Sequence, residues 1–468
     1  MLPDNVLLEI FCFYREEEEG NAIIYLAWKW HLLVHPCRRW RQVVFGSPLH
    51  LDLQILCTPR TPAGKDLGIW PSLPIVIDIR HNGGPYDGNF PSSSEDNIVA
   101  ALELIDRVCK IYIRTLGPDM EKIFTAMQGT FPLLTELLIW SASGNGPVLP
   151  AEFLAPHLQT ISLRNIIFPA LPTLLLSTGD LVSLWLEDIP RSGYISPEAM
   201  VVGLAALPRL KDFTIRFQWD TPRPDRIPPP PLTRILLPAL TLFEFKGASE
   251  YLEVLVSRID APQLNEFSID YLNQLADVSA NQLRTFVDRS VGPRLTQFRN
   301  AVLQFHDDLV VWKPNSRANG QLGSSAWIAI RCRGIDWQVS HIAQVLSDLS
   351  ASLPNAVHLN LDDYLMVYDP KLAGTDDIEW LHLLHQFSTV QTLHLSQVLA
   401  GHVALALEGI PSETVAEVMP SLDSIYLEGQ PASSIEKFIA ARQRSGRPVT
   451  VIDTNEEFDE RVNSYDRK

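Results

Sequence analysis

The sequence has few cysteines, and they are not arranged for a disulfide framework or a zinc site. The five cysteines are odd in number and widely scattered, and no pair is spaced as Cys-x-x-Cys. The sequence also lacks any Asn-x-Ser/Thr glycosylation site. These absences favour a reducing compartment, in which buried free thiols are the ordinary state of cysteine.

Long apolar runs and a basic start are missing as well. The longest apolar runs, such as residues 22–28, are far too short to span a bilayer. Near the N-terminus, Asp4 and Glu9 stand where a signal peptide would need basic residues. We therefore expect a cytoplasmic or nuclear protein without a membrane partner.

Positive charge is scarce relative to negative charge, because 38 Lys and Arg residues face 55 Asp and Glu residues and the formal net charge is −17. Nucleic acids and anionic membranes need clustered Lys and Arg, so neither is expected as a partner. The 46% of apolar residues still provide for a large buried core. A chain of 468 residues is too long for one ordinary core unless that core is built from repeats.

Motifs that carry chemistry are also absent. The sequence contains no phosphate-binding loop, no Gly-x-Ser-x-Gly elbow and no His-Glu-x-x-His motif. His382 and His385 have helical spacing and a metal pair is conceivable, but without a third nearby ligand ordinary surface histidines are favoured. We expect no catalytic residue, no cofactor and no metal, and a protein that is not an enzyme.

The first fifty residues have the pattern of three short amphipathic helices. Pro3 and Asp4 suit the start of a helix, and Leu7, Ile10 and Phe11 then share one apolar face. A second apolar stretch covers residues 23–34 and a third covers residues 37–45. Three helices this short cannot bury both of their faces alone, so we expect such a unit to dock on another surface.

Residues 1–48 resemble an F-box domain. The likeness lies in Leu2-Pro3, the apolar pattern after it, the Cys-Arg-Arg-Trp-Arg run at 37–41 and the Phe-Gly-Ser-Pro exit at 45–48. This resemblance implies docking on a Skp-type adaptor and, through it, on a cullin-RING ubiquitin ligase. The adaptor-binding residues that it implies are Leu2, Pro3, Leu7, Leu8, Ile10, Phe11, Trp40, Val43 and Val44.

Pro36 departs from the F-box pattern, which has a small aliphatic residue inside the third helix. A proline inside a helix costs about 3 kcal/mol or more. Either the third helix begins at Pro36 or this copy docks weakly. The alternative interpretation of the whole segment is a helical cap on the repeats that follow.

From residue 108 onward one pattern recurs: a turn residue, an apolar residue, and then two apolar residues separated by one position. The first residue of each alternating pair serves as an anchor, and successive anchors are 23 to 34 residues apart. A short alternating strand at this period is typical of a leucine-rich-repeat solenoid. The anchors are Leu137, Ile161, Leu184, Phe213, Phe243, Phe267, Phe298, Ile328, Leu359, Leu393 and Ile425.

The expected fold is therefore α/β: a three-helix F-box-like unit, then a solenoid with a parallel concave sheet and helices on its convex side. The expected boundaries are 1–48 for the F-box-like domain, 49–97 for a loop-rich connector, 98–453 for the solenoid and 454–468 for a polar tail. This combination resembles the fungal, basidiomycete-type F-box proteins with irregular leucine-rich repeats. The resemblance implies the substrate-recognition subunit of a Skp–cullin–F-box ubiquitin ligase. The alternative is a leucine-rich-repeat scaffold or adaptor without a ligase.

The residues between and after the inward positions of each strand should form the concave face, where an unknown protein target would bind. Tryptophan, tyrosine and arginine dominate binding hot spots, and arginines recur at the second outward position. We predict a basic stripe that takes an acidic or phosphorylated segment, with tryptophans as apolar anchors. The predicted target-binding residues are Trp140, Arg164, Trp185, Arg216, Arg299, Arg331 and Tyr426.

Overall fold

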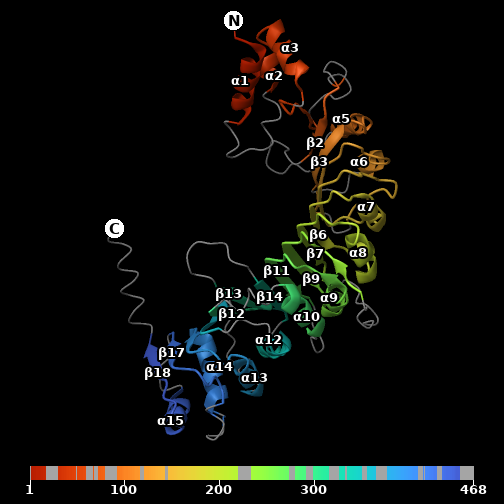
Figure 1. Ribbon diagram of the computed structural model, residues 1–468. Coiled ribbons are helices and arrows are strands. Elements are labelled where there is room, and N and C mark those ends of the chain that lie inside the picture. Colours follow the sequence, from red (N-terminus) through yellow and green to blue (C-terminus); the bar gives the residue numbers. More distant parts are fainter. Residues whose placement is uncertain are drawn as a thin grey trace. The chain divides into compact units, whose positions relative to one another are not determined.

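A computed structural model of residues 1–468 divides into two compact units (Figure 1). Unit 1 consists of Met1–Ile195 with Val202–Asp212, and unit 2 consists of Ser196–Val201 with Phe213–Lys468. The structure describes residues 2–16, 30–48, 50–59, 67, 72–79, 92–115, 121–142, 146–219, 233–272, 280–290, 299–315, 326–332, 335–349, 356–364, 377–408, 410, 415, 417–428 and 435–453. The proline tract at 221–231 and the tail at 454–468 lie outside the described residues.

Unit 1 begins with three helices, α1 (Asp4–Glu16), α2 (Trp30–Val34) and α3 (Arg38–Gly46), and α3 contacts both of the others. Their shared core buries Leu7, Phe11 and Val44 almost completely. Phe11 also meets the Trp40 ring edge to face at 4.9 Å between ring centroids. We call α1, α2 and α3 the three-helix unit.

Pro36 lies between α2 and α3 and interrupts neither helix. The third helix begins two residues later at Arg38, and the Cys37 sulfur accepts a hydrogen bond from the Trp40 backbone N–H at 3.4 Å. Because Pro36 stands outside the helix, it removes no helical hydrogen bond. The proline therefore does not impose the penalty that the sequence suggested.

The described strands of the rest of unit 1 form one parallel sheet in sequence order, and the helices lie along one of its faces (Figure 1). The sheet begins before residue 98, the expected start of the solenoid, because two strands and the beginning of a helix fall within 49–97. The strands are β1 (Ile55–Cys57), β2 (Ile75–Asp78), β3 (Val108–Thr115), β4 (Glu136–Ser141), β5 (Thr160–Arg164) and β6 (Ser183–Ile189). The helices are α5 (Ser92–Leu102), α6 (Glu121–Ala126), α7 (Leu171–Ser177) and the 3-10 helix η2 (Arg191–Gly193), and α8 (Pro197–Leu204) contributes residues to both units.

Unit 2 continues the same layout with a mainly parallel sheet. Its main strands, in spatial order, are β7 (Asp212–Phe217), β9 (Leu242–Gly247), β11 (Glu266–Tyr271), β14 (Ala326–Arg331), β13 (Leu309–Asn315), β12 (Asn300–His306), β15 (His358–Tyr364), β16 (Thr392–Leu395), β17 (Ser424–Leu427) and β18 (Thr450–Asp453). Its helices are α9 (Ser249–Val256), α10 (Asn281–Ser290), α12 (Ile335–Leu349), α13 (Asp377–His385), α14 (Gln397–Glu408) and α15 (Glu436–Arg444). The short strands β8 (Ile235–Leu236) and β10 (Ile259–Asp260) pair apart from the main sheet.

The expectation that all strands run parallel is wrong for β13, which pairs antiparallel with both β12 and β14. Only Asp307 and Asp308 separate β12 from β13. A connection this short cannot return the chain through a helix, so the chain turns back as a hairpin. Large side chains are buried in this region: Trp312 of β13 and Trp380 of α13 are both at most 1% exposed, and the Trp380 ring contacts Phe305 of β12 at 5.6 Å between centroids.

The repeat anchors that fall within the described residues are all buried, at 0 to 4% exposure, as predicted. The anchor Phe298 lies outside the described residues. In β12, which begins two residues after it, Ala301 pairs in register with the anchor Leu359 of β15. Neighbouring repeats are also joined by a recurrent bond at the start of their strands. One carbonyl accepts from two successive backbone N–H groups of the next repeat, as Thr135 does from Gln159 at 2.8 Å and Thr160 at 3.1 Å.

Asn165 links two repeats through its side chain. It is 7% exposed, has a left-handed φ of 53°, and donates from Nδ2 to the Ser141 carbonyl of the preceding repeat at 3.2 Å. Asparagine tolerates this backbone region and satisfies a buried carbonyl at the same time. Buried anchors, a mainly parallel sheet and such ties between repeats make up a mixed α/β, leucine-rich-repeat-like solenoid.

Candidate protein-binding surfaces

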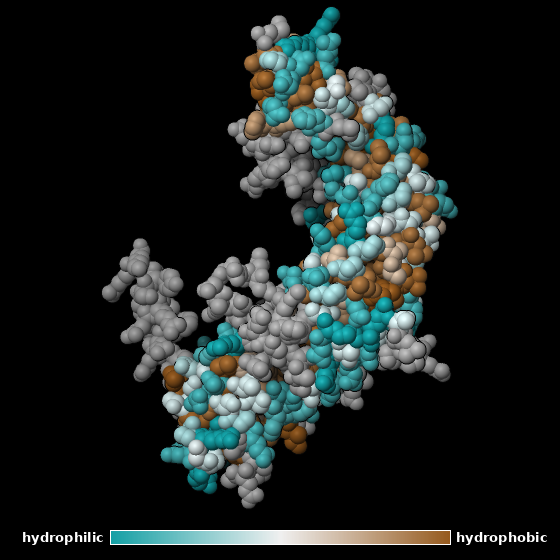
Figure 2. All heavy atoms as spheres, viewed as in Figure 1, coloured by the Kyte–Doolittle hydropathy of each residue, from teal (hydrophilic) through white to brown (hydrophobic). Residues whose placement is uncertain are grey.

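The three-helix unit presents an exposed apolar stripe along α1. The stripe begins with Leu2, just before the helix, and Val6, Ile10 and Phe13 follow at helical spacing. The exposed fractions are 52% for Leu2, 36% for Val6, 45% for Ile10 and 67% for Phe13. Leu32 from α2 is another exposed apolar residue of the unit, at 48%. Figure 2 shows brown, hydrophobic residues gathered at the surface of this unit. A surface that faces water seldom leaves such apolar residues in a row.

The predicted adaptor-binding residues fall into two groups. Leu2, Pro3 and Ile10 are exposed, and Leu8 and Trp40 are half-buried. In contrast Leu7, Phe11, Val43 and Val44 are buried inside the unit, at 0 to 8% exposure. Side chains of the second group hold the helices together, so a partner could contact only the first group directly.

An ion pair fixes the start of α1 against α3. Arg39 donates to the Asp4 carboxylate at 2.6 Å and also bonds the Leu2 carbonyl. Both side chains are partly exposed, and an isolated surface pair of this kind contributes at most about 1 kcal/mol. The pair matters more for geometry, because it orders Leu2 at the end of the stripe.

The second surface is the open face of the sheet, by which we mean the face opposite the helices. In unit 1 the side chains on this face form rows across neighbouring strands. One row runs from Tyr112 through Leu138 and Ser162 to Trp185. The next row runs from Arg114 through Trp140 and Arg164 to Glu187.

Trp140 lies between two arginines in its row. The Arg114 guanidinium stacks over the indole at 4.1 Å and the Arg164 guanidinium lies at 5.8 Å from it. Arg164 is also bound to Asp188 at 2.7 Å. Trp185, 40% exposed, projects from β6 on the same face. Trp140, Arg164 and Trp185 therefore do share one face, as the alternation predicted.

The predicted arginines of unit 2 do not form a bare basic stripe. Arg216 pairs with Glu244 at 2.5 Å. Arg331 pairs with Asp270 at 3.0 Å and with Asp308 at 3.7 Å. Burial raises the pKa of Asp270 above its ordinary value, and the nearby Arg331 opposes that rise. Since each arginine is neutralised within the sheet, the basic stripe predicted from the sequence is wrong at these positions.

Arg299 is also misplaced by the sequence prediction. It precedes β12 and is not on the strand, and its carbonyl accepts hydrogen bonds from the N–H groups of Val357 and His358. Its backbone therefore occupies the same inter-repeat position as Thr135, outside the strand's outward row.

Tyr426 lies on the open face of unit 2, where its ring stacks on His394 at 4.3 Å with an interplanar angle of 7°. Burial and the neighbouring His358 lower the pKa of His394, so the neutral imidazole is favoured in this stack. Burial likewise raises the pKa of Asp362, which faces the same row of strands. This part of the open face is therefore aromatic and polar.

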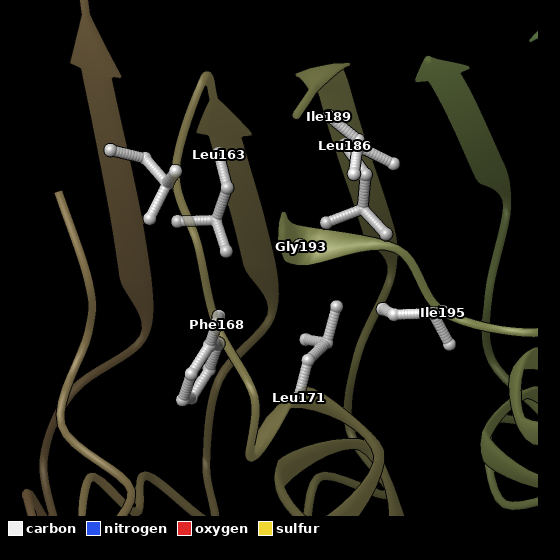
Figure 3. Close-up of a pocket in the computed structure, with 8 residues that line it drawn as sticks. Leu163, Phe168, Leu171, Leu186, Ile189, Gly193 and Ile195 are labelled. Carbon is white, nitrogen blue, oxygen red and sulfur yellow. The ribbon is translucent and has the colours of Figure 1, made fainter. Parts of the chain in front are cut away.

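A small cavity lies in unit 1 at the ends of β5 and β6, and aliphatic and aromatic side chains point into it (Figure 3). It is lined by Leu163, Ile166, Phe168, Leu171, Leu186, Ile189, Gly193 and Ile195. No polar side chain is among these residues, so the cavity offers a ligand no orienting hydrogen bond. Among the described residues no group of three or more His, Cys, Asp or Glu is placed to hold a metal ion.

Three residues of these candidate surfaces, Arg114, Val6 and Phe13, were not identified from the sequence. Arg114 precedes the first anchor that the repeat pattern identified, so it was not assigned to the concave face. Val6 and Phe13 were not singled out because α1 is apolar on two sides, and the pattern of Leu7, Ile10 and Phe11 drew attention to one of them. The helical spacing of Leu2, Val6, Ile10 and Phe13 is the signal that could have identified the other apolar side of α1.

Comparisons with known proteins add little to this description. No protein-family model matches the sequence, and no curated protein matches it. None of the helices in the described part of the chain has the length and apolar content needed to cross a bilayer. Among solved structures, the leucine-rich repeat-containing protein LegL7 from Legionella pneumophila is similar, with 14% sequence identity over 74% of this chain and 91% of that chain, and with a TM-score of 0.24.

Proposed function

We propose that this protein is a non-catalytic interaction receptor: the three-helix unit docks on a Skp-type adaptor of a cullin-RING ubiquitin ligase, and the repeats capture a protein target. The observation that carries the proposal is the exposed apolar stripe of Leu2, Val6, Ile10 and Phe13 on a unit whose own core is already filled. The F-box-like pattern of residues 1–48 supplies the identity of the partner. The same stripe supports docking in general whether or not the partner is this adaptor.

The second candidate is a leucine-rich-repeat scaffold without a ligase. Its support in the sequence is the departure from the F-box pattern at Pro36. The position of Pro36 outside α3 removes this support, because the third helix is intact from Arg38 to Gly46. Both candidates lack an enzyme activity, and they differ only in what the three-helix unit binds.

Binding of a purified Skp-type adaptor, measured by isothermal titration calorimetry, separates the two candidates. The informative variants are Val6→Glu and Ile10→Glu, because both positions are exposed and the substitutions leave the core of the unit intact. A charge buried without a partner in the interface should weaken binding by about 100-fold, or about 2.8 kcal/mol. Leu7→Ala is a poorer test, since it removes a core side chain and would loosen the helices themselves.

Leu176→Glu is the matched control, because Leu176 is an exposed apolar residue, at 57%, on α7, a helix of unit 1 that lies outside the three-helix unit. It should bind the adaptor like the wild type. No binding of the wild-type protein at micromolar concentration would refute the ligase role and leave the scaffold. Equal binding by wild type and Ile10→Glu would mean that the adaptor does not use the stripe.

A further inference from the structure

The open face of unit 1 carries a charge that the sheet does not neutralise. Lys110 is paired with Glu136 at 2.8 Å, and Arg164 is paired with Asp188 at 2.7 Å. Among the described residues, the contact of the exposed Arg114 guanidinium is the face of Trp140 at 4.1 Å, and no carboxylate lies within ion-pair distance of it. Stacking on a ring leaves the edge N–H groups of a guanidinium free to donate.

The same face leaves aromatic surface uncovered beside this charge. Trp185 is 40% exposed, and β5, the strand between β4 and β6, contributes the small side chain of Ser162 to the row of Trp185, next to the row of Trp140. Neighbouring strands lie about 4.8 Å apart, so β4 and β6 are about 10 Å from each other. A side chain of a partner can therefore lie over Ser162 and contact an indole without displacing any bulky group.

We infer that Arg114, Trp140 and Trp185 form a docking site for an extended peptide segment of a protein target that carries one carboxylate and, a few residues away, one large apolar side chain. The inference rests on the proposed receptor function and names the chemistry of its target. The carboxylate binds the free edge of Arg114, and the apolar side chain lies over Ser162 against Trp185. Glu187, in the row beside Trp185, repels an acidic group there and sets the direction of the segment.

The register of the strands fixes the spacing of the two recognised groups. Arg114 on β3 and Trp185 on β6 are separated by three strand-to-strand spacings, about 14 Å in total, and by two residues along the strand direction, about 7 Å. The straight distance is then about 16 Å, which an extended chain covers in about five residues. A phosphorylated or highly acidic segment is disfavoured, because among the described residues of this face Lys110 and Arg164 are already paired with carboxylates, and Arg114 alone is not.

Selection of a nine-residue phage-displayed random peptide library on the immobilised full-length protein tests the inference. Enriched peptides should carry Asp or Glu about five residues from Trp, Phe or Leu. The best of them, labelled with fluorescein, should lose at least ten-fold in affinity by fluorescence polarisation against Arg114→Glu and against Trp185→Ala. Replacing the acidic residue of the peptide by Lys should restore binding to Arg114→Glu and abolish binding to the wild type.

The matched controls are Arg191→Glu, which reverses an exposed arginine of η2, and Trp337→Ala, which removes an indole that is 61% exposed on α12. Both should bind the peptide like the wild type. The inference is overturned if no peptide is enriched, if the enriched peptides lack an acidic residue, or if Arg114→Glu binds them unchanged. It is also overturned if the protein is a dimer in size-exclusion chromatography with light scattering and Trp185→Ala dissociates it, since the face would then be covered by a second copy.

Adaptor binding measured on the same samples distinguishes this inference from the proposed function. Arg114→Glu and Trp185→Ala should retain the adaptor, because neither lies in the three-helix unit. If no sample binds adaptor while the wild type still binds the selected peptides, the ligase role fails and the docking site stands. Peptide binding lost from Ile10→Glu would show that the two surfaces are not independent and would overturn the inference as stated.

Discussion

Glu253 should make the stability of unit 2 fall as the pH rises. Glu253 is 4% exposed, and its carboxylate accepts hydrogen bonds from the N–H groups of Gln282 at 2.8 Å and Leu283 at 2.9 Å, in the first turn of α10. Burial raises the pKa of Glu253 from 4.5 to about 7, against the lowering effect of these two bonds, and nearby Asp348 adds to the rise. The carboxyl group is therefore harder to ionise in the folded protein than in the unfolded chain.

The sign and size of the effect follow from this difference. A raised pKa in the folded state gives stability that is fully present below pH 4.5 and is lost as the pH rises through 7. A pKa difference of about 2.5 corresponds to about 3.4 kcal/mol in total, of which about 2.5 kcal/mol falls between pH 5 and pH 8. Glu253→Gln keeps the shape and an acceptor oxygen for α10 but does not titrate, so it should lack this dependence.

Urea unfolding at pH 5 and at pH 8, followed by circular dichroism, measures the effect as a difference between two proteins. Relative to Glu253→Gln, the wild type should lose about 2.5 kcal/mol of unfolding free energy between the two pH values. Other groups titrate in this range in both proteins, and the comparison cancels them. If the gap between wild type and variant were the same at both pH values, Glu253 would not titrate as the burial of its carboxylate requires.

Three further predictions rest on burial and backbone geometry. Leu184→Ala should cost about 2–5 kcal/mol of unfolding free energy because the side chain is fully buried, whereas the adjacent Trp185→Ala should cost far less. Thermal unfolding of both variants measures this difference, and the reverse order would mean that the strand register is wrong. Asn165→Ala should destabilise the protein by about 2–3 kcal/mol, because it leaves the Ser141 carbonyl without this hydrogen bond and places alanine at a left-handed φ. Asn165→Gly should recover about 1 kcal/mol of this loss, because glycine adopts a left-handed φ without strain. Equal melting temperatures for the two variants would contradict the strain. Burial raises the pKa of Cys109 to about 11 and that of Cys332 to about 12. Iodoacetamide at pH 8 should therefore label the exposed Cys37 much faster than either of these thiols. Peptide mass spectrometry measures the labelling rates, and similar rates for all three cysteines would refute the burial of Cys109 and Cys332.

The repeat pattern of the sequence could predict burial but not strand direction. Alternation at the anchors identified inward side chains such as Leu184 and Phe243 because the side-chain period of a strand is the same in every context. That period is also the same for parallel and antiparallel strands. The sequence of the reversed strand β13 therefore carries no sign of its direction, and only the two-residue link at Asp307 and Asp308 gives a local sign of the hairpin.

The orientation of α1 shows a second limit of the sequence. Its residues are apolar on two sides, and a helical pattern alone cannot tell which side faces the other helices. The structure buries Leu7 and Phe11 against α3 and leaves Ile10 and Phe13 exposed. In this orientation Phe11 contacts the ring of Trp40 in α3, a residue that a pattern local to α1 does not include.

The electrostatics of the open face could not be predicted from the sequence for a related reason. Arginines at equivalent strand positions suggest a basic stripe as long as their carboxylate partners are not known. These partners come from other repeats: Asp188, which pairs with Arg164, is 24 residues away, and Asp270, which pairs with Arg331, is 61 residues away. Once these pairs are formed, the positions that looked most basic carry little net charge. Among the described residues of the unit 1 sheet, Arg114 keeps a charge without a carboxylate partner; it stands before the first identified anchor, Leu137, and contacts the ring of Trp140. A binding surface on a repeat sheet is therefore defined by the side chains that the neighbouring repeats leave unpaired, which requires the register of the strands as well as their sequence.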